Sequence, residues 1–288
     1  MALTTLKIGM DYYHESMGYN TQTVAQTLQD MQSIALYADR VKIYHNPFTN
    51  NGGVDPSVSL AACQMICQQA LAAGLPVSWV ENVDNSGGYL TDTNWPTYVS
   101  LVQADAITAS QAGASEFYVG NEIYSHNNGD PGFADLPARI KTLASSVTFP
   151  GVIGYEAQAS ELTSWVSEGI GSMGKIMFNF YSTESSLKSQ CHTMVTTFGS
   201  SAEIGEFSTV HGFETDSNSD QDIWCVQMGR LVNIIQTAGV SRSYAFEWRS
   251  HSTTFGQSFL TENGVYLQDV NIAIQALVNP GGRRFLTT

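Results

Sequence analysis

Residues 117–122 read Phe117-Tyr118-Val119-Gly120-Asn121-Glu122, an apolar run of strand type that ends abruptly in Asn-Glu. A carboxylate at the tip of a buried strand is costly to desolvate, so it is typical of a site that uses it. Residues 202–207, Ala202-Glu203-Ile204-Gly205-Glu206-Phe207, have the same shape. These two segments predict that Glu122 and Glu206 are a pair of carboxylates facing one cleft.

Similar apolar runs recur along the whole chain and alternate with segments of helical periodicity. The predicted strands are 6–10, 40–44, 76–80, 117–119, 152–155, 175–180, 202–207 and 243–248. The predicted helices are 24–38, 57–73, 95–112, 134–146, 160–169, 184–198, 219–238 and 266–278. Apolar strands that alternate with helices are typical of a parallel sheet covered by helices. Eight such units predict an α/β fold, a closed (β/α)8 TIM barrel.

An open, doubly wound sheet is the main alternative architecture. It would carry a glycine-rich turn after the first strand, and residues 11–15 contain no glycine. The sequence also contains no linker that would divide it. We therefore expect residues 1–288 to form a single catalytic barrel domain.

Charge and composition restrict the partners. The chain has 12 basic and 26 acidic residues, a net charge of −14, and an isoelectric point near 4.6. Nucleic acids and anionic membranes bind basic surfaces, so neither is expected as a partner. No apolar run approaches the roughly 20 residues of a membrane span. A neutral polysaccharide or oligosaccharide meets no such objection, and we expect a monomer without a cofactor.

Only 13% of the residues are charged, and hydroxyl and amide side chains fill the difference. This composition favours an extracellular location. The chain shows no signal peptide, which keeps a cytoplasmic location as the alternative.

The four cysteines match no zinc-binding spacing. Cys63 and Cys67 lie four residues apart on a predicted helix, which is poor geometry for a disulfide. Cys191 and Cys225 lie on two later helical segments and could meet across a helix pair.

In a barrel, residues at the carboxyl ends of the strands build the site. The candidates, in chain order, are Asp11, Tyr12, His45, Glu81, Asn82, Asn121, Glu122, Glu156, Tyr181, Glu206, Glu247 and Trp248. Paired carboxyls suit cleavage of a glycosidic bond, because one donates a proton to the leaving oxygen while the other attacks the anomeric carbon. Glu122 and Glu206 follow the fourth and seventh strands, whose tips can converge on one sugar.

Five short motifs carry a family resemblance. They are Val41-Lys42-Ile43-Tyr44, the 117–122 segment, Asn179-Phe180-Tyr181, Ile204-Gly205-Glu206 and Ala245-Phe246-Glu247-Trp248. With these motifs in this order over nearly its full length, the chain resembles the clan-A retaining glycoside hydrolases. Within that clan it is most similar to family 17, the β-1,3-glucanases and related glucanosyltransferases.

The resemblance implies a role for several residues. Glu122 would be the general acid/base and Glu206 the nucleophile. Asn121 would bind the 2-hydroxyl of the sugar, Tyr181 would hydrogen-bond near the nucleophile, and Trp248 would form a floor under the sugar. Asp11, Tyr12, His45, Glu81, Asn82 and Glu247 are the further residues expected to bind substrate.

The chain departs from the family pattern in three places. Phe207-Ser208-Thr209-Val210 replaces the usual small residue and Gly-Trp-Pro after the nucleophile. Lys42 stands where the family usually has Arg, and the acidic cluster after the last strand is reduced to Glu247. These changes leave the two catalytic glutamates of the clan in place, but they weaken the expectation that the substrate is β-1,3-glucan.

The sequence therefore predicts a retaining glycosidase or transglycosylase that acts on a β-linked glucan, first of all β-1,3-glucan. The same mechanism on β-1,4-mannan, xylan or cellulose is one alternative, and a non-catalytic carbohydrate-binding barrel is another. A metal-dependent hydrolase is the third, because five histidines fall after strands: His14, His45, His126, His211 and His251. Their spacing is too loose for a metal site, and we expect no metal.

Overall fold

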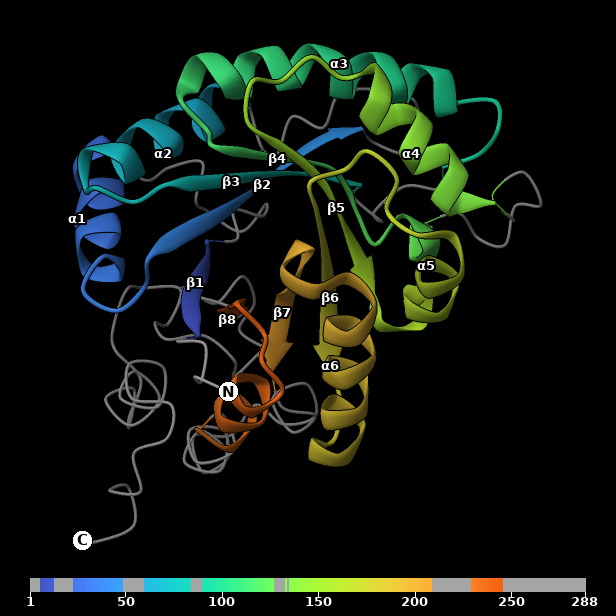
Figure 1. Cartoon of the computed structure of the whole chain (residues 1–288). Coiled ribbons are helices and arrows are strands. Elements are labelled where there is room, and N and C mark those ends of the chain that lie inside the picture. The colour runs from blue at the N-terminus through green and yellow to red at the C-terminus, as the bar shows by residue number, and fades with distance from the viewer. Residues whose placement is uncertain are drawn as a thin grey trace, which may run out of the picture.

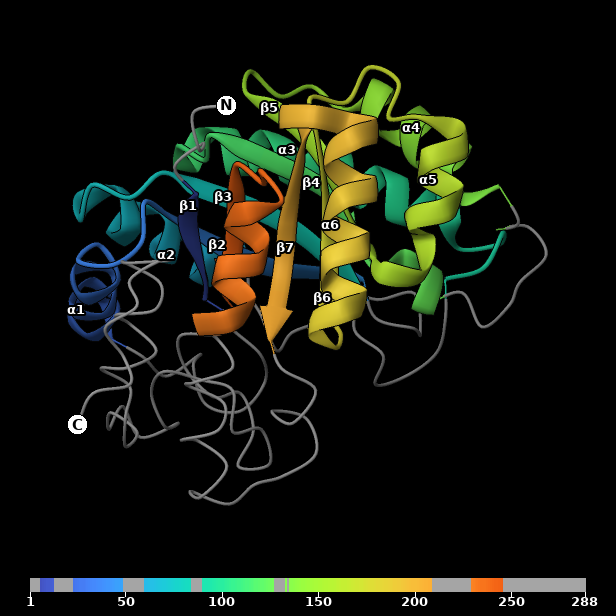
Figure 2. The ribbon, with the colours of Figure 1, turned by 60° about the horizontal axis from the view of Figure 1, so that its bottom comes forward.

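The structure is a computed structural model that describes residues 6–12, 23–48, 60–83, 90–126, 133, 135–208 and 229–245. Within these ranges eight parallel strands close into one barrel, in which chain neighbours are sheet neighbours and β8 pairs with β1. Figures 1 and 2 show the helices wrapped around the outside of this sheet. The predicted (β/α)8 architecture is confirmed.

The strands are β1 Lys7–Tyr12, β2 Arg40–Phe48, β3 Val77–Val83, β4 Glu116–Asn121, β5 Val152–Gln158, β6 Lys175–Tyr181, β7 Ala202–Ser208 and β8 Arg242–Ala245. Several run further than the sequence predicts. In β2, β3 and β5 the ladder continues past the apolar core, for example through the pair His45 and Glu81. Polar residues expected to follow these strands therefore lie inside them, where successive side chains point to opposite faces.

The helices are α1 Val24–Ile34, α2 Leu60–Ala72, α3 Trp95–Ala112, α4 Leu136–Ser146, α5 Leu162–Glu168 and α6 Glu184–Phe198. Short 3₁₀ turns follow β4 (η2, Ile123–His126) and β5 (η4, Ala159–Glu161) and precede β7 (η5, Gly199–Ser201). Residues 229–237 are also helical, and the predicted helix 266–278 lies outside the described residues. No helix in the described ranges is long and apolar enough to cross a membrane.

Local sequence explains where individual helices begin and end. Thr23 and Gln26 form a reciprocal capping box at the start of α1. Gly113 ends α3 with φ 92°, a backbone conformation that a side chain disfavours. Cys63 and Cys67 on α2 and Cys191 on α6 are buried free thiols, whereas Cys225 lies outside the described residues.

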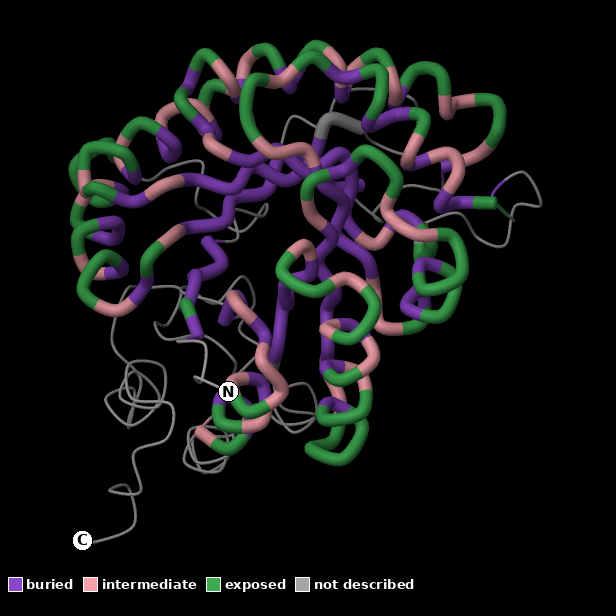
Figure 3. Tube along the Cα trace, in the orientation of Figure 1, coloured by how far each residue is buried: buried purple, intermediate pink, exposed green. Residues whose placement is uncertain are grey.

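Figure 3 shows buried residues along the strands and on the inner sides of the helices. Most of the apolar core lies between the sheet and the helices, with Met10, Ile43, Phe117 and Phe178 among its members. A smaller cluster fills the barrel interior and consists of Tyr44, Val80, Tyr118, Met177 and Tyr244. This inner cluster separates two polar layers inside the barrel.

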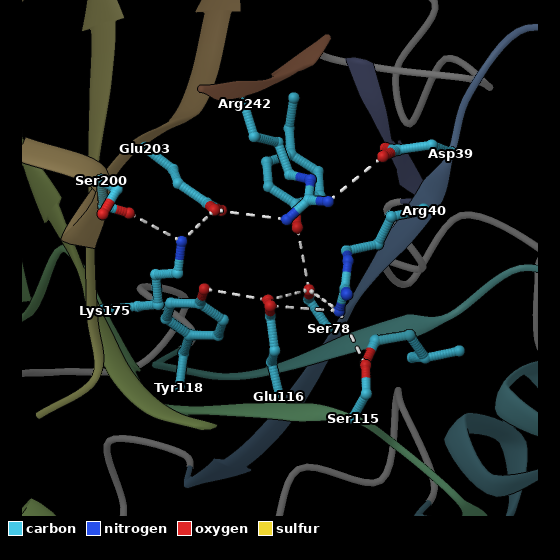
Figure 4. Close-up of polar contacts among 12 residues, drawn as sticks. Asp39, Arg40, Ser78, Ser115, Glu116, Tyr118, Lys175, Ser200, Glu203 and Arg242 are labelled. Carbon is cyan, nitrogen blue, oxygen red and sulfur yellow. Dashed lines mark hydrogen bonds and ion pairs between the residues drawn. The ribbon is translucent and has the colours of Figure 1, made fainter. Parts of the chain in front are cut away.

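The polar layer at the amino-terminal end of the strands is drawn in Figure 4. Arg40 pairs with Glu116 at 3.3 Å, and Arg242 pairs with Glu203 at 3.3 Å and with Asp39 at 3.2 Å. Lys175 reaches Glu203 from the other side at 2.5 Å. Three basic and three acidic side chains therefore balance one another at this end, and Glu203 belongs to this layer.

Candidate active site

The other polar layer lies at the carboxyl ends of the strands and contains both glutamates. Glu122 directly follows β4 and has φ 46°, in the left-handed region that residues other than glycine rarely adopt. Its N–H donates to the carbonyl oxygen of Glu156 at 2.8 Å, and its own carbonyl accepts from the N–H of Ser125 at 2.9 Å. These bonds hold the backbone turn that carries the side chain.

Glu206 lies near the end of β7, where the pairing with both neighbouring strands shifts register. The side chain is buried, with 7% of the residue exposed. The hydroxyl of Tyr44 donates to Oε1 at 2.6 Å, and the hydroxyl of Tyr181 donates to Oε2. A carboxylate with a donor on each oxygen is fixed in orientation and satisfied as an anion.

Glu122 has a different environment. Its Oε1 accepts one bond, from the Nδ2 group of Asn179 at 2.9 Å. Burial raises the pKa of Glu122 to about 8, and the negative charge of Glu206 adds to this effect. A pKa near 8 favours the protonated form of Glu122 at neutral pH, which is the form that a general acid needs.

A chain of amide side chains leads from β3 to Glu122. Asn121 donates to Asn82 Oδ1 at 3.3 Å, and Asn179 donates to Asn121 Oδ1 at 3.3 Å as well as to Glu122. The structure thus brings together Asn82, Asn121, Tyr181 and the two glutamates, all expected at the site. Asn121 precedes Glu122 in the chain, its side chain bonds to Asn82 and Asn179, and its role toward a sugar stays a prediction.

Lys42, Asp11 and Glu156 lie beneath this surface and are fully buried. The ammonium group of Lys42 donates to the Glu156 carboxylate and to the Gly205 carbonyl at 2.7 Å, and lies 3.3 Å from Asp11. Burial raises the pKa of Glu156 to about 7 and that of Asp11 well above its usual range. Asp11 was expected to bind substrate, but the structure places it in this buried group.

Three further residues expected at the site lie on the outer face of the barrel. Tyr12 donates to Asp30 on α1 at 2.9 Å, while His45 and Glu81 contact each other at 3.0 Å beside Asp105 on α3. The alternation along a strand explains this outcome, because Asp11 and Tyr44 point inward and the next residue in each strand points outward. The expectation that Tyr12, His45 and Glu81 bind substrate is corrected accordingly.

His45, Glu81 and Asp105 form the group of described residues that could hold a metal ion. Burial alone would lower the pKa of His45, but the neighbouring carboxylates of Glu81 and Asp105 raise it to about 10. A protonated His45 between two carboxylates accounts for the cluster as an ion pair. It lies behind the barrel wall and not among the groups around Glu122 and Glu206.

Glu247 and Trp248 lie outside the described residues, as do His14, His211 and His251. Lys42, Tyr44 and Asn179 were not predicted from the sequence as site residues, although they belong to the motifs at 41–44 and 179–181 that carry the family resemblance. The signal that could have found them is the period of two. Lys42 and Tyr44 share one face of β2, and Asn179 and Tyr181 share one face of β6.

No protein-family model and no curated protein matches this sequence. Its fold, however, is similar to that of solved glycoside hydrolases. One is the exo-β-1,4-mannosidase Op5Man5 from Opitutaceae bacterium strain TAV5 (TM-score 0.69, 11% identity), with 94% of this chain and 59% of that one covered.

Two other neighbours match over most of their length. The GH113 β-mannanase AaManA from Alicyclobacillus acidocaldarius gives TM-score 0.65 and 12% identity, covering 96% of this chain and 99% of the other. A GH5_18 protein from Streptomyces cattleya in complex with Manb1-4GlcNAc gives TM-score 0.70 and 10% identity, covering 99% and 82%. The TM-scores establish the shared barrel fold, and at identities this low they establish nothing further. None of these neighbours supports family 17 in particular.

Proposed function

We propose that this chain is a retaining glycoside hydrolase that acts on a β-linked glycan, with Glu122 as acid/base and Glu206 as nucleophile. The observation that carries the proposal is the contrast between the two carboxyls. Glu206 is held by two phenolic donors, whereas burial and the charge of Glu206 keep the proton on Glu122. Two carboxyls with such different surroundings are what double displacement requires.

In the first step the Glu206 carboxylate attacks the anomeric carbon while Glu122 donates its proton to the leaving glycosidic oxygen. The products are a glycosyl ester on Glu206 and an ionised Glu122. In the second step Glu122 takes a proton from water, which attacks the anomeric carbon and releases Glu206. Asn121 binds a hydroxyl of the sugar, and Tyr181 keeps Glu206 in its attacking position.

For the substrate we propose β-1,4-linked mannan or its oligosaccharides, ahead of β-1,3-glucan. The structural neighbours are named as a β-mannosidase and a β-mannanase, and one is bound to Manb1-4GlcNAc. The residues after Glu206 also depart from the family-17 pattern on which the expectation of β-1,3-glucan rested. A neutral glycan is compatible with the net charge of −14.

The test is a screen of purified protein on β-1,4-mannan, β-1,3-glucan, xylan and cellulose, with reducing ends as the readout. Proton NMR of the first product then gives its anomeric configuration, which must be β. Binding of a glycan without any product would favour a non-catalytic carbohydrate-binding barrel. An α-configured first product would exclude the retaining mechanism.

A further inference from the structure

Lys42 occupies the barrel interior beneath the two glutamates. Its ammonium group contacts three oxygens, on Asp11, Glu156 and Gly205. Glu156 and Gly205 accept hydrogen bonds from the ammonium group, and the Asp11 carboxylate lies within ion-pair distance of it at 3.3 Å. A fully buried cation is retained only where it is paired and hydrogen-bonded, and Lys42 has two hydrogen-bond acceptors and two carboxylates beside it.

Glu156, the main partner of Lys42, is attached to Glu122 through the backbone. The Glu156 carbonyl oxygen accepts the N–H of Glu122 at 2.8 Å, and Asn121 pairs with Glu156 in the β4–β5 ladder. These two contacts fix the backbone where Glu122 adopts its left-handed conformation. A displacement of Glu156 would therefore move the proposed acid/base.

Glu156 and Lys42 also reach Glu206. The Tyr44 hydroxyl lies 3.4 Å from Glu156 Oε1 and donates to Glu206 Oε1 at 2.6 Å. Lys42 holds the carbonyl of Gly205, the residue before Glu206. Glycine is required at this point, because a Cβ atom on Gly205 would lie 2.5 Å from Glu156 Oε1.

We propose that the ion pair of Lys42 and Glu156 is a positioning element that holds both glutamates of the site from behind. Neither residue contacts the substrate, since both side chains are fully buried. Lys42 sets the place of Glu156, and Glu156 sets the backbone of Glu122 and, with Tyr44, the carboxylate of Glu206. This inference rests on the proposed function of the two glutamates.

The charges around Glu156 make the inference testable by titration. It is faced by Lys42 and Tyr44 from β2, Asp11 from β1, Glu206 from β7 and Asn179 from β6, with Glu122 beyond the end of β4. The negative charge of Glu156 contributes to the raised pKa of Glu122. Glu156→Gln removes that charge, and Lys42→Met removes the cation that lowers the pKa of Glu156, so that Glu156 keeps its proton to higher pH.

The experiment compares Glu156→Gln and Lys42→Met with Lys175→Met. The last is a matched control, because Lys175 also pairs with a buried glutamate, Glu203, but at the amino-terminal end of the barrel (Figure 4). Each variant is first shown to be folded by circular dichroism. Glu156→Gln keeps the side-chain shape and decides the question if Lys42→Met does not fold.

We expect both test variants to lower kcat by about tenfold or more, with KM changed by less than about threefold. In Glu156→Gln the basic limb of the rate profile should move to lower pH by about half a unit, because a negative charge near Glu122 is lost. In the control Lys175→Met, kcat, KM and the position of the basic limb should all stay as in the wild type. A kcat equal to that of the wild type in both test variants, or an unmoved basic limb in Glu156→Gln, would overturn the inference.

A second measurement separates this inference from the proposed function. Glu122 is titrated in the free protein by carboxyl ¹³C NMR, with Glu122→Gln used to assign its signal. A lower titration midpoint in Glu156→Gln supports the coupling even if no glycan is cleaved, and absence of cleavage by the wild type contradicts the proposed function alone. An unchanged midpoint in a folded Glu156→Gln variant overturns the inference.

Discussion

At the scale of single residues, Tyr44 and Tyr181 give Glu206 what the proposed nucleophile needs, a fixed orientation with one phenolic donor on each carboxyl oxygen. Glu206→Gln keeps the shape and loses the attacking oxygen. We expect kcat/KM to fall by about 10⁴-fold or more, because the amide of glutamine cannot form the glycosyl ester. Steady-state kinetics with the exposed-surface variant Glu168→Gln as control checks this, and a loss below about tenfold would contradict the assignment.

The raised pKa of Glu122 fixes the direction of the pH dependence. Glu122 must be protonated to donate, so kcat/KM should decline on the basic side with an apparent pKa near 8. In Glu122→Gln this basic limb should disappear together with most of the activity on substrates with poor leaving groups. The measurement is the rate profile from pH 4 to about pH 10, where activity that stays flat across this range would count against Glu122.

At the scale of elements, the close approach of β5, β6 and β7 depends on Gly205. A Cβ atom there would lie 2.5 Å from both Asn179 Oδ1 and Glu156 Oε1. We expect Gly205→Ala to reduce the free energy of unfolding by about 1–3 kcal/mol, as overpacking does, and to lower kcat. Urea denaturation measures the first effect. Gly174→Ala, where the nearest contact is 3.1 Å to a Val152 methyl group, is the milder control.

The elements also show what could be predicted from the sequence. The number and order of strands and helices follow from periodicity, and Glu122 and Glu206 follow from their place after apolar runs. The ends of β2, β3 and β5 do not, because they are set by pairing with a neighbouring strand. That pairing carries the strands through His45 and Glu81, and a window of local sequence does not contain it; once the strands are known to continue, the alternation of side chains gives the face of each residue.

At the scale of the whole molecule, the barrel interior has two polar layers of different charge. The amino-terminal layer is balanced, whereas the carboxyl-terminal layer sets Lys42 against Asp11, Glu122, Glu156 and Glu206. The first layer suits a structural role. The second, with its excess of carboxyls, is the layer in which we propose that proton transfer takes place.

This division predicts that the amino-terminal layer governs stability without governing catalysis. Arg242→Met leaves Asp39 and part of Glu203 without a counter-charge, so we expect a loss of about 3 kcal/mol in unfolding free energy. kcat per folded molecule should stay unchanged. Urea denaturation paired with kinetics tests both, and an unstable variant with reduced kcat would show that the layers are coupled.

The left-handed backbone of Glu122 makes the proposed acid/base a burden on the fold. Its φ of 46° is a conformation that glycine adopts freely, and its carboxyl is half-buried with a raised pKa. Glu122→Gly removes the backbone strain and the cost of burying an ionised carboxyl. We therefore expect an inactive protein whose melting temperature at pH 8, measured by calorimetry, is higher than that of the wild type. A lower one would show that Glu122 stabilises the fold. Selection for stability alone would replace this glutamate. Its presence indicates that stability of the fold is given up for catalytic activity.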